Sequence, residues 1–205
     1  MKSKEDLKSE IEKRHLIHFK ANLFFIDSKY LNAPASDKEK NVADKSNFIR
    51  KVRYAYWVLS VLELCKIYGK SNDHYSMEKL INKLWNNYSN SDWNTLLSKE
   101  DIARIRENYN RQEIQTIIKK LRGLRDEYYA HLDRNPKKTI SDYTPNYIEV
   151  ETLLKLHESF LKEISLKVFK TEIQFKNPSF GSADGILHNL AEYQEKIISD
   201  IWKHK

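Results

Sequence analysis

Helix-breaking residues are rare in this chain, and this scarcity constrains its fold more than any other feature. Only four glycines and four prolines occur among the 205 residues, whereas 32% of the residues are charged. Glycine and proline are the residues that most readily end or kink a helix. The sequence therefore predicts long helices with wide, solvated outer faces.

Apolar residues recur with helical spacing in segments that breakers separate. These segments predict helices over residues 4–30, 38–68, 76–88, 99–132, 145–170 and 182–202. In the second segment, apolar side chains fill nearly the whole circumference, which predicts the most buried helix. No segment alternates as a strand does, so we expect an all-α bundle of long antiparallel helices.

The segments predict a single domain over residues 1–205. Its core is expected at about residues 40–170, with an N-terminal helix within residues 1–37 and a C-terminal helix over 182–203. Short polar side chains that can accept the free N–H groups of a first turn mark the expected helix starts. These candidate caps are Ser36 or Asp37, Ser76, Ser98 and Thr144, the last followed by Pro145. Gly69 is expected to end the second helix, and Gly123 to weaken the fourth or admit close packing.

The formal net charge is +7. A basic surface speeds association with polyanions, chiefly nucleic acids, although a lysine-rich soluble surface explains the charge equally well. A single cysteine, Cys65, lies in an apolar run and permits no disulfide within the chain, so we expect a reducing, cytoplasmic location. The longest apolar run is too short to span a bilayer, so no membrane association is expected.

Arg125 and His131 are the residues best suited to chemistry on a phosphate, with Asp126 directly after the arginine. A guanidinium holds a phosphate through a planar fork of donors, and an imidazole transfers a proton near neutral pH. On an ideal helix the two positions lie about 120° apart. They meet at one phosphate only if the helix ends near His131, as Pro136 indicates, or if a second chain supplies the other half.

Several neighbours are expected to contact an RNA substrate: Arg122, Tyr128, Tyr129, Arg134, Lys137 and Lys138. Glu63 lies in the apolar second helix and needs a partner, either a salt bridge or a group beside the site. His15 and His18 are read as surface residues. No metal-ligand set and no phosphate loop or dinucleotide motif is present, so neither a metal nor a cofactor is expected.

The pattern of Arg125, Asp126 and His131 in an all-helical chain resembles that of the HEPN superfamily. In that superfamily an arginine is followed by a polar residue and then, after four to six intervening positions, by a histidine, and here five positions intervene. The string LRGLRDEYYAHLD, which follows the apolar helix YAYWVLSVLELCKIY, is most similar to the HEPN-like branch of bacterial abortive-infection proteins of the AbiU type. The resemblance covers residues 48–161.

This resemblance implies a homodimeric, metal-independent ribonuclease that serves as a phage-defence or toxin effector. His131 would transfer a proton at the ribose 2′-OH or the leaving oxygen, Arg125 would hold the phosphate, and Asp126 would orient one of them. An antitoxin or regulatory partner is also implied, although Asp133 stands where silenced HEPN toxins often carry tyrosine. The alternative is a non-catalytic helical module that binds RNA or a protein.

Overall fold

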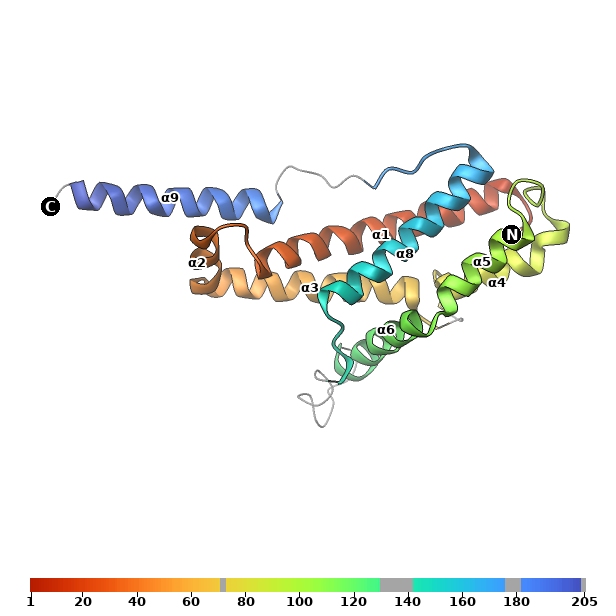
Figure 1. The fold of residues 1–205 in the computed structure, drawn as a ribbon, viewed down its shortest axis with the longest axis horizontal. Helices are drawn as coiled ribbons and strands as arrows, with labels where there is room; N and C mark the ends of the chain where they lie inside the picture. The colour runs from red at the N-terminus through yellow and green to blue at the C-terminus, as the bar shows by residue number, and fades with distance from the viewer. Residues whose placement is uncertain (71–72, 130–141, 176–181, 204–205) are drawn as a thin grey trace. The chain divides into compact units, whose positions relative to one another are not determined.

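The part of the chain that the structure describes is helical. The computed structural model describes residues 1–70, 73–129, 142–175 and 182–203. Every regular element in these ranges is a helix or helical turn, as Figure 1 shows, so the predicted all-α class is confirmed. The chain divides into two compact units, residues 1–21 with 61–175 and residues 22–60 with 176–205. The expectation of one domain over the whole chain stays a prediction.

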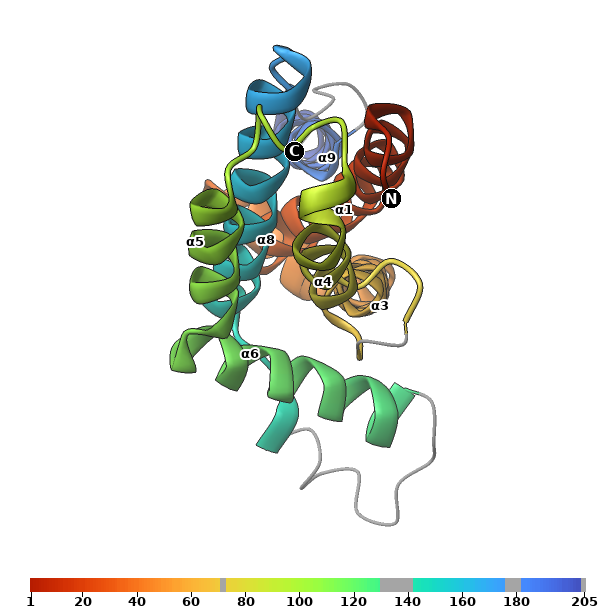
Figure 2. The same ribbon diagram turned by 90° about the vertical axis from the view of Figure 1, so that its right-hand side faces the viewer.

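The larger unit holds the first part of α1 (Lys4–Asn32) and the end of α3 (Asn47–Tyr68). Its other elements are α4 (Met77–Asn87), η1 (Tyr88–Asn90), α5 (Lys99–Asn110), α6 (Gln112–Gly123), the π-helical turn η2 (Leu124–Tyr129), α8 (Tyr147–Ile164) and the π-helical turn η3 (Ser165–Phe169). Helix α8 lies beside α5 (Figure 2), to which it is joined by an ion pair between Arg104 and Glu163. Lys120 of α6 reaches Glu149 at the start of α8, with Nζ 2.5 Å from Oε1.

Apolar residues from these helices and from the turn before α5 form the core of the larger unit. The fully buried members include Leu64, Ile67, Leu80, Leu84, Trp93, Leu97, Ile102, Leu121, Val150, Leu153, Leu161 and Ile164. Each such side chain contributes roughly 1.5–3 kcal/mol when it leaves water. This burial holds α3, α4, α6 and α8 in place around the residues considered below.

The smaller unit holds the rest of α1, then α2 (Asp37–Lys45), the first part of α3, and α9 (Ala183–Lys203). Leu31, Val42, Ile49 and Leu187 belong to its core cluster. Lys38 of α2 pairs with Glu195 of α9, with Nζ 2.5 Å from Oε2, and lies 3.8 Å from Glu192. The backbone N–H of Ala183 donates to Asp27 of α1.

Two predicted helices are each divided in the structure. Residues 38–68 form α2 and α3, because Ser46 adopts an extended backbone between them and its hydroxyl accepts the N–H of Ile49. Such local bonds let serine compete with a continuous helix. Residues 99–132 are likewise interrupted at Arg111, whose backbone is not helical (φ −54°, ψ 137°) between α5 and α6.

Most predicted helix starts are confirmed. Ser36, Ser76 and Ser98 each accept an N–H from the first turn of the helix that follows. The predicted cap of the helix at residues 145–170 was wrong: Asn146, not Thr144, caps α8. Its side chain accepts the N–H of Glu149, and the Glu149 side chain accepts the N–H of Asn146. Helix α3 ends at Tyr68, directly before Gly69, as predicted.

The part of α3 before Ser60 is less buried than its apolar circumference predicts. Phe48 is 73% exposed and Leu59 is 40% exposed, whereas Val61, Leu64 and Ile67 beyond Ser60 are fully buried. The apolar residues of α9 beyond Ala191 are exposed as well. A helical apolar pattern shows which residues need cover but not which of them the same chain covers.

A buried histidine pair is the largest departure from the expected surface histidines. His18 and His157 are 1% and 0% exposed, and their Nδ1 atoms lie 3.2 Å apart. One ring must donate to the other, which requires the accepting ring to be neutral. Burial lowers the pKa of His18 to about 4 and that of His157 well below its usual value. His15 is half-buried beside Phe175, so the surface assignment fails for it too.

We expect the buried pair to make the protein less stable in mild acid. An unfolded histidine takes up a proton below a pH of about 6.5, whereas the folded pair remains neutral. The unfolded state then binds more protons, so the free energy of unfolding falls as the pH drops from about 6.5 toward 4. The slope is about 1.4 kcal/mol per pH unit for each histidine, and urea unfolding at several pH values measures it.

The variant His157→Gln should flatten this slope, and the exposed His74→Gln serves as the matched control with the pair intact. An unchanged slope in His157→Gln would show that the pair does not set the acid sensitivity.

Candidate functional site

Arg122 binds the end of α3. Its Nε donates to the carbonyl of Tyr68 at 2.7 Å, and its Nη2 donates to the carbonyl of Gly69 at 2.6 Å. The last carbonyls of a helix have no partner within the helix and carry partial negative charge, so a guanidinium there satisfies both needs. Arg122 is the second-last residue of α6, so it joins the end of α6 to the C-terminus of α3.

Asp73 folds over Gly69 just beyond that helix end. Its Oδ2 accepts the N–H of Lys70 at 2.9 Å and lies so close that a Cβ on Gly69 would be 2.0 Å away. The same Oδ2 lies 3.4 Å from Nη1 of Arg125. Glycine at position 69 thus leaves room for a carboxylate that also reaches the motif arginine.

Arg125 is held between two carboxylates. Its Nε donates to Oδ1 of Asp126 at 2.7 Å, and Asp73 approaches Nη1 from the other side. Nη2 makes no hydrogen bond within the described ranges, and the side chain is 25% exposed. The hydrogen bond with Asp126 raises the pKa of Arg125, and the same bond lowers the pKa of Asp126. Asp126 is therefore ionised at neutral pH and bonded to the guanidinium.

The backbone around Arg125 is a π-helical turn. Helix α6 ends at Gly123, and residues Leu124–Tyr129 form η2. Single π turns are rare and are frequent at functional sites, because the wider turn redirects the side chains that follow. Ideal α-helix geometry therefore does not describe residues 124–129.

Cys65 lies behind this turn as a core residue. Its thiol is buried and donates to the carbonyl of Leu121 at 3.6 Å. Burial raises the pKa of Cys65 to about 12, so the sulfur is a thiol rather than a thiolate at neutral pH. Cys65 therefore supports the turn by packing.

An open groove of about 620 Å³ runs along α6 and reaches η2. It is lined by Gln112, Gln115, Thr116, Ile118, Lys119, Arg122, Gly123, Asp126, Glu127 and Tyr143. The lining combines amide, hydroxyl and charged groups of both signs with one aromatic ring. Such groups suit a ligand with hydrogen-bonding edges and phosphate charge.

Tyr143 enters this groove by packing on Gly123. A Cβ built on Gly123 would meet the Tyr143 ring at 2.3 Å. The close-packing alternative for Gly123 is therefore the one that the structure shows. The contact brings residue 143, which lies just before α8, against the last residue of α6.

The remaining predicted site residues fall into two groups. His131, Arg134, Lys137 and Lys138 lie outside the described residues, as do the side chains of Tyr128 and Tyr129 in η2. Glu63 is described: its Oε1 pairs with Lys66 one turn along α3 at 2.5 Å, and its buried Oε2 bonds to none of the described residues. Their assigned roles stay predictions.

Sequence reasoning missed Asp73, Lys70 and Tyr143. Asp73 and Lys70 flank Arg125 and Asp126 through contacts of 3.4 and 3.7 Å. A glycine followed by an aspartate in a short interhelical loop is a signal of tight backbone packing, but it does not reveal which arginine lies opposite. The polar residues Gln112, Gln115, Thr116 and Lys119 follow one another at helical spacing, so the sequence did indicate a polar face at the groove.

Neither a metal-binding cluster nor a membrane-spanning helix occurs within the described ranges. No group of three or more histidine, cysteine, aspartate or glutamate side chains there is arranged to hold a metal ion. No helix in those ranges combines the length and apolar character that crossing a membrane requires.

Comparison with known families identifies this helical chain as a HEPN-type domain. The matching family model, described as AbiU2, covers residues 7–184, so the protein belongs to the AbiU2 family of HEPN domains. The resemblance to the AbiU-type branch is confirmed, and it extends well beyond residues 48–161. No curated protein and no solved structure matches the chain.

We expect Arg122→Ala to lower the free energy of unfolding by about 2–4 kcal/mol, because two helix-end carbonyls lose a charged donor. Arg122→Lys should recover part of this loss, since an ammonium reaches one carbonyl but lacks the planar fork. Urea unfolding measures both. The exposed Lys119→Ala on the same helix is the control and should change stability by less than about 0.5 kcal/mol. Equal stability of the two alanine variants would contradict the structural role of Arg122.

Gly123→Ala should destabilise the protein by about 1–3 kcal/mol, because the added methyl displaces the Tyr143 ring. In a Tyr143→Ala background the same substitution should cost nothing or stabilise α6, since alanine is the better helix former. A double-mutant cycle by chemical unfolding measures this coupling. Equal effects of Gly123→Ala in both backgrounds would refute the contact.

Proposed function

We propose that this AbiU2-family protein is a HEPN-type ribonuclease of phage defence. In this proposal it acts as a homodimer and cleaves RNA without a metal ion. The ribose 2′-OH attacks the adjacent phosphorus, the bond from phosphorus to the 5′ oxygen breaks, and a 2′,3′-cyclic phosphate forms. His131 moves a proton at the attacking or leaving oxygen, and Arg125 binds the phosphate.

The geometry of Arg125 is the observation that carries this proposal. Its guanidinium is fixed by Asp126 and Asp73, yet Nη2 makes no hydrogen bond within the described ranges. An arginine held in place before substrate binds stabilises developing charge without reorganisation. Family membership adds that the arginine belongs to a HEPN domain.

The α6 groove supplies a place for the rest of an RNA strand. Lys119 is exposed on its wall, and Gln112 offers an amide group to base edges, whereas the amide nitrogen of Gln115 donates to the carbonyl of Tyr109. Tyr143 offers an aromatic face on which a base can stack. Asp126 and Glu127 at the η2 end oppose a phosphate, so in this proposal Lys119 and the Arg125 guanidinium, to which Asp126 is bonded, supply the positive charge that the backbone needs.

One observation favours the alternative of a non-catalytic HEPN module that binds RNA or a protein. The ion pair of Arg125 with Asp73 also joins η2 to the loop after α3, which is a structural role. In that case the loss of Arg125 would lower stability and leave no activity to measure.

The experiment is cleavage of labelled RNA by the full chain in the presence of EDTA. We expect wild-type protein to cleave, and Arg125→Ala and His131→Ala each to slow cleavage by about 100-fold or more. Asp126→Asn should reduce the rate less, because it misplaces the guanidinium without removing it. Arg50→Ala, an exposed arginine of the smaller unit, is the matched control and should cleave at the wild-type rate.

Melting temperatures of the same variants separate the two functions. Lost cleavage with unchanged melting supports the enzyme. Wild-type cleavage by a folded Arg125→Ala variant would refute the catalytic assignment. RNA binding without cleavage by the wild type would favour the binding module.

A further inference from the structure

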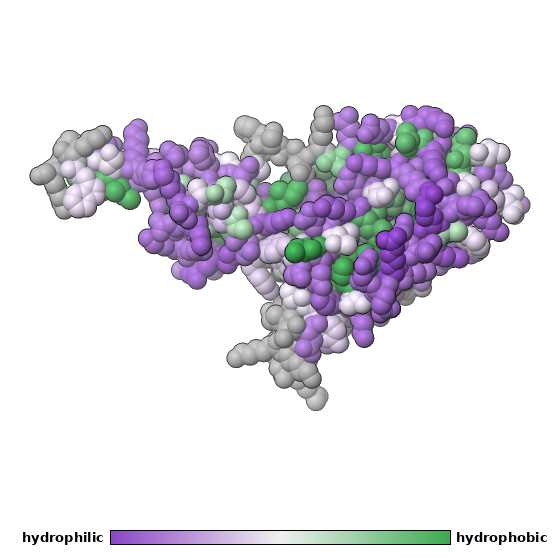
Figure 3. Space-filling model, in the orientation of Figure 1, coloured by the Kyte–Doolittle hydropathy of each residue, from purple (hydrophilic) through white to green (hydrophobic). Residues whose placement is uncertain are grey.

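The second half of α9 exposes an apolar face that the described part of its own chain does not cover. The last buried residue of this helix is Ala191, and every residue from position 192 to position 202 is exposed. Five of these are large and apolar: Tyr193, Ile197, Ile198, Ile201 and Trp202. In Figure 3, hydrophobic residues reach the surface near the far end of α9.

These residues continue the same face that α9 buries in its first half. At 100° per residue, Ile197, Ile198 and Ile201 fall on the half of the circumference that also carries Leu187 and Ala191. Leu187 and Ala191 are 1% and 3% exposed. A helical segment of about eleven residues is marginally stable in water without packing. The apolar face of residues 192–202 therefore needs packing against another surface to be stable.

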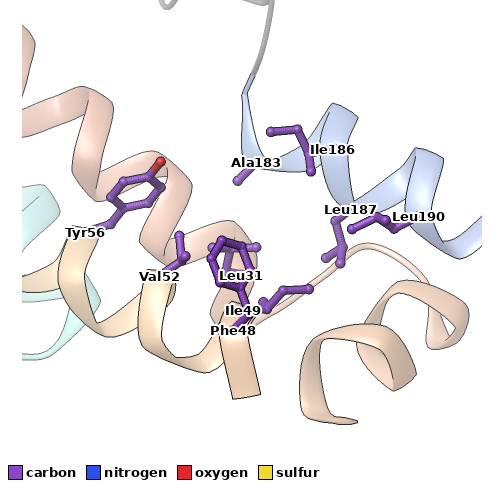
Figure 4. Close-up of a pocket in the computed structure, with 9 residues that line it drawn as sticks. All are labelled: Leu31, Phe48, Ile49, Val52, Tyr56, Ala183, Ile186, Leu187 and Leu190. Atoms are coloured by element: carbon purple, nitrogen blue, oxygen red, sulfur yellow. The ribbon is translucent and has the colours of Figure 1, made fainter. Parts of the chain in front are cut away.

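An apolar pocket lies at the first half of the same helix. Leu31 of α1 and Phe48, Ile49 and Val52 of α3 form one wall, and Ile186, Leu187 and Leu190 of α9 form the other, as Figure 4 shows. The pocket has a volume of about 190 Å³. An apolar cavity of roughly 150 Å³ accepts a benzene-sized group, so the pocket has room for one large side chain.

We propose that two copies of this chain pair through α9, antiparallel about a two-fold axis. The exposed half of each helix then covers the pocket of the other copy, with Leu190 opposite Ile197 and Ile186 opposite Ile201. The first half of α9 lines the pocket and its second half carries the uncovered face, so the surface is self-complementary, as a two-fold interface requires. Helix α9 carries none of the candidate ribonuclease residues.

The exposed apolar area fits a stable dimer. The five residues at the end of α9, together with Phe48, Ile186 and Leu190, expose on the order of 800 Å². This is about what each partner contributes to a standard interface, and it exceeds the 300–600 Å² of the largest patch on a typical monomer.

The charge of α9 argues against a lipid surface as the occupant. The helix has four acidic and two basic residues. Helices that lie on membranes carry lysine and arginine on the polar face to meet anionic lipids. Here Glu192 and Glu195 face Lys38 of their own chain instead.

The first test is sedimentation of the full chain at micromolar concentration. We expect a dimer for wild-type protein and a monomer with unchanged melting of the core for Ile197→Asp/Ile201→Asp. The matched control is Ile148→Asp, which replaces an isoleucine that is 76% exposed on α8 and should leave the dimer intact. A monomeric wild type, or a dimer that survives the double substitution, would overturn the proposal.

Cross-linking tests the antiparallel register. Residues 190 and 197 lie about 10 Å apart along one helix, too far for an intrachain disulfide. Leu190→Cys/Ile197→Cys should therefore form a covalent dimer on oxidation. Asn189→Cys/Lys196→Cys has the same spacing on the polar face and should not. Equal cross-linking of both variants, or flotation of monomeric wild type with anionic vesicles, would refute the pairing. None of these readouts uses ribonuclease activity. A monomeric wild type would also contradict the homodimer of the proposed function, whereas a dimer that survives Ile197→Asp/Ile201→Asp would overturn only the pairing through α9.

Discussion

The bond between the Arg122 guanidinium and the carbonyls that end α3 is the contact on which the candidate site depends. It satisfies two groups that the helix itself leaves unpaired. Each charge-assisted bond contributes about 1.5–3 kcal/mol. Because Arg122 is three residues before Arg125, fixing it at α3 also fixes the start of η2. The position of the motif arginine thus follows from a structural arginine one turn earlier.

Asp73 and Asp126 complete the arrangement through electrostatics. Asp73 is available to Arg125 only because Gly69 leaves space for its carboxylate beside the end of α3. Asp126 adjoins Arg125 in sequence, and the turn lets neighbouring side chains meet. In the proposed enzyme, these two carboxylates orient the cation and leave Nη2 for a phosphate. The two carboxylates also compete with a phosphate for the guanidinium, because their negative charge repels an anionic substrate.

Local sequence predicted the elements better than the contacts between them. Helix starts at Ser36, Ser76 and Ser98 were readable because a cap acts within three residues. The Arg122–Tyr68 bond joins residues 54 positions apart, and the His18–His157 pair spans 139. Such pairings depend on how helices pack, which helical periodicity does not determine. The interruption at Ser46 was missed because apolar residues continue on both sides of it.

The central claim is that this HEPN domain cuts RNA by attack of the ribose 2′-OH next to Arg125. The most direct measurement is the chemistry of the ends left on RNA after incubation with purified protein. The account predicts a 2′,3′-cyclic phosphate on one fragment and a 5′-hydroxyl on the other, because the attacking oxygen belongs to the RNA itself. Fragments with 5′-phosphate and 3′-hydroxyl ends would contradict it, since they require attack by water from outside the strand.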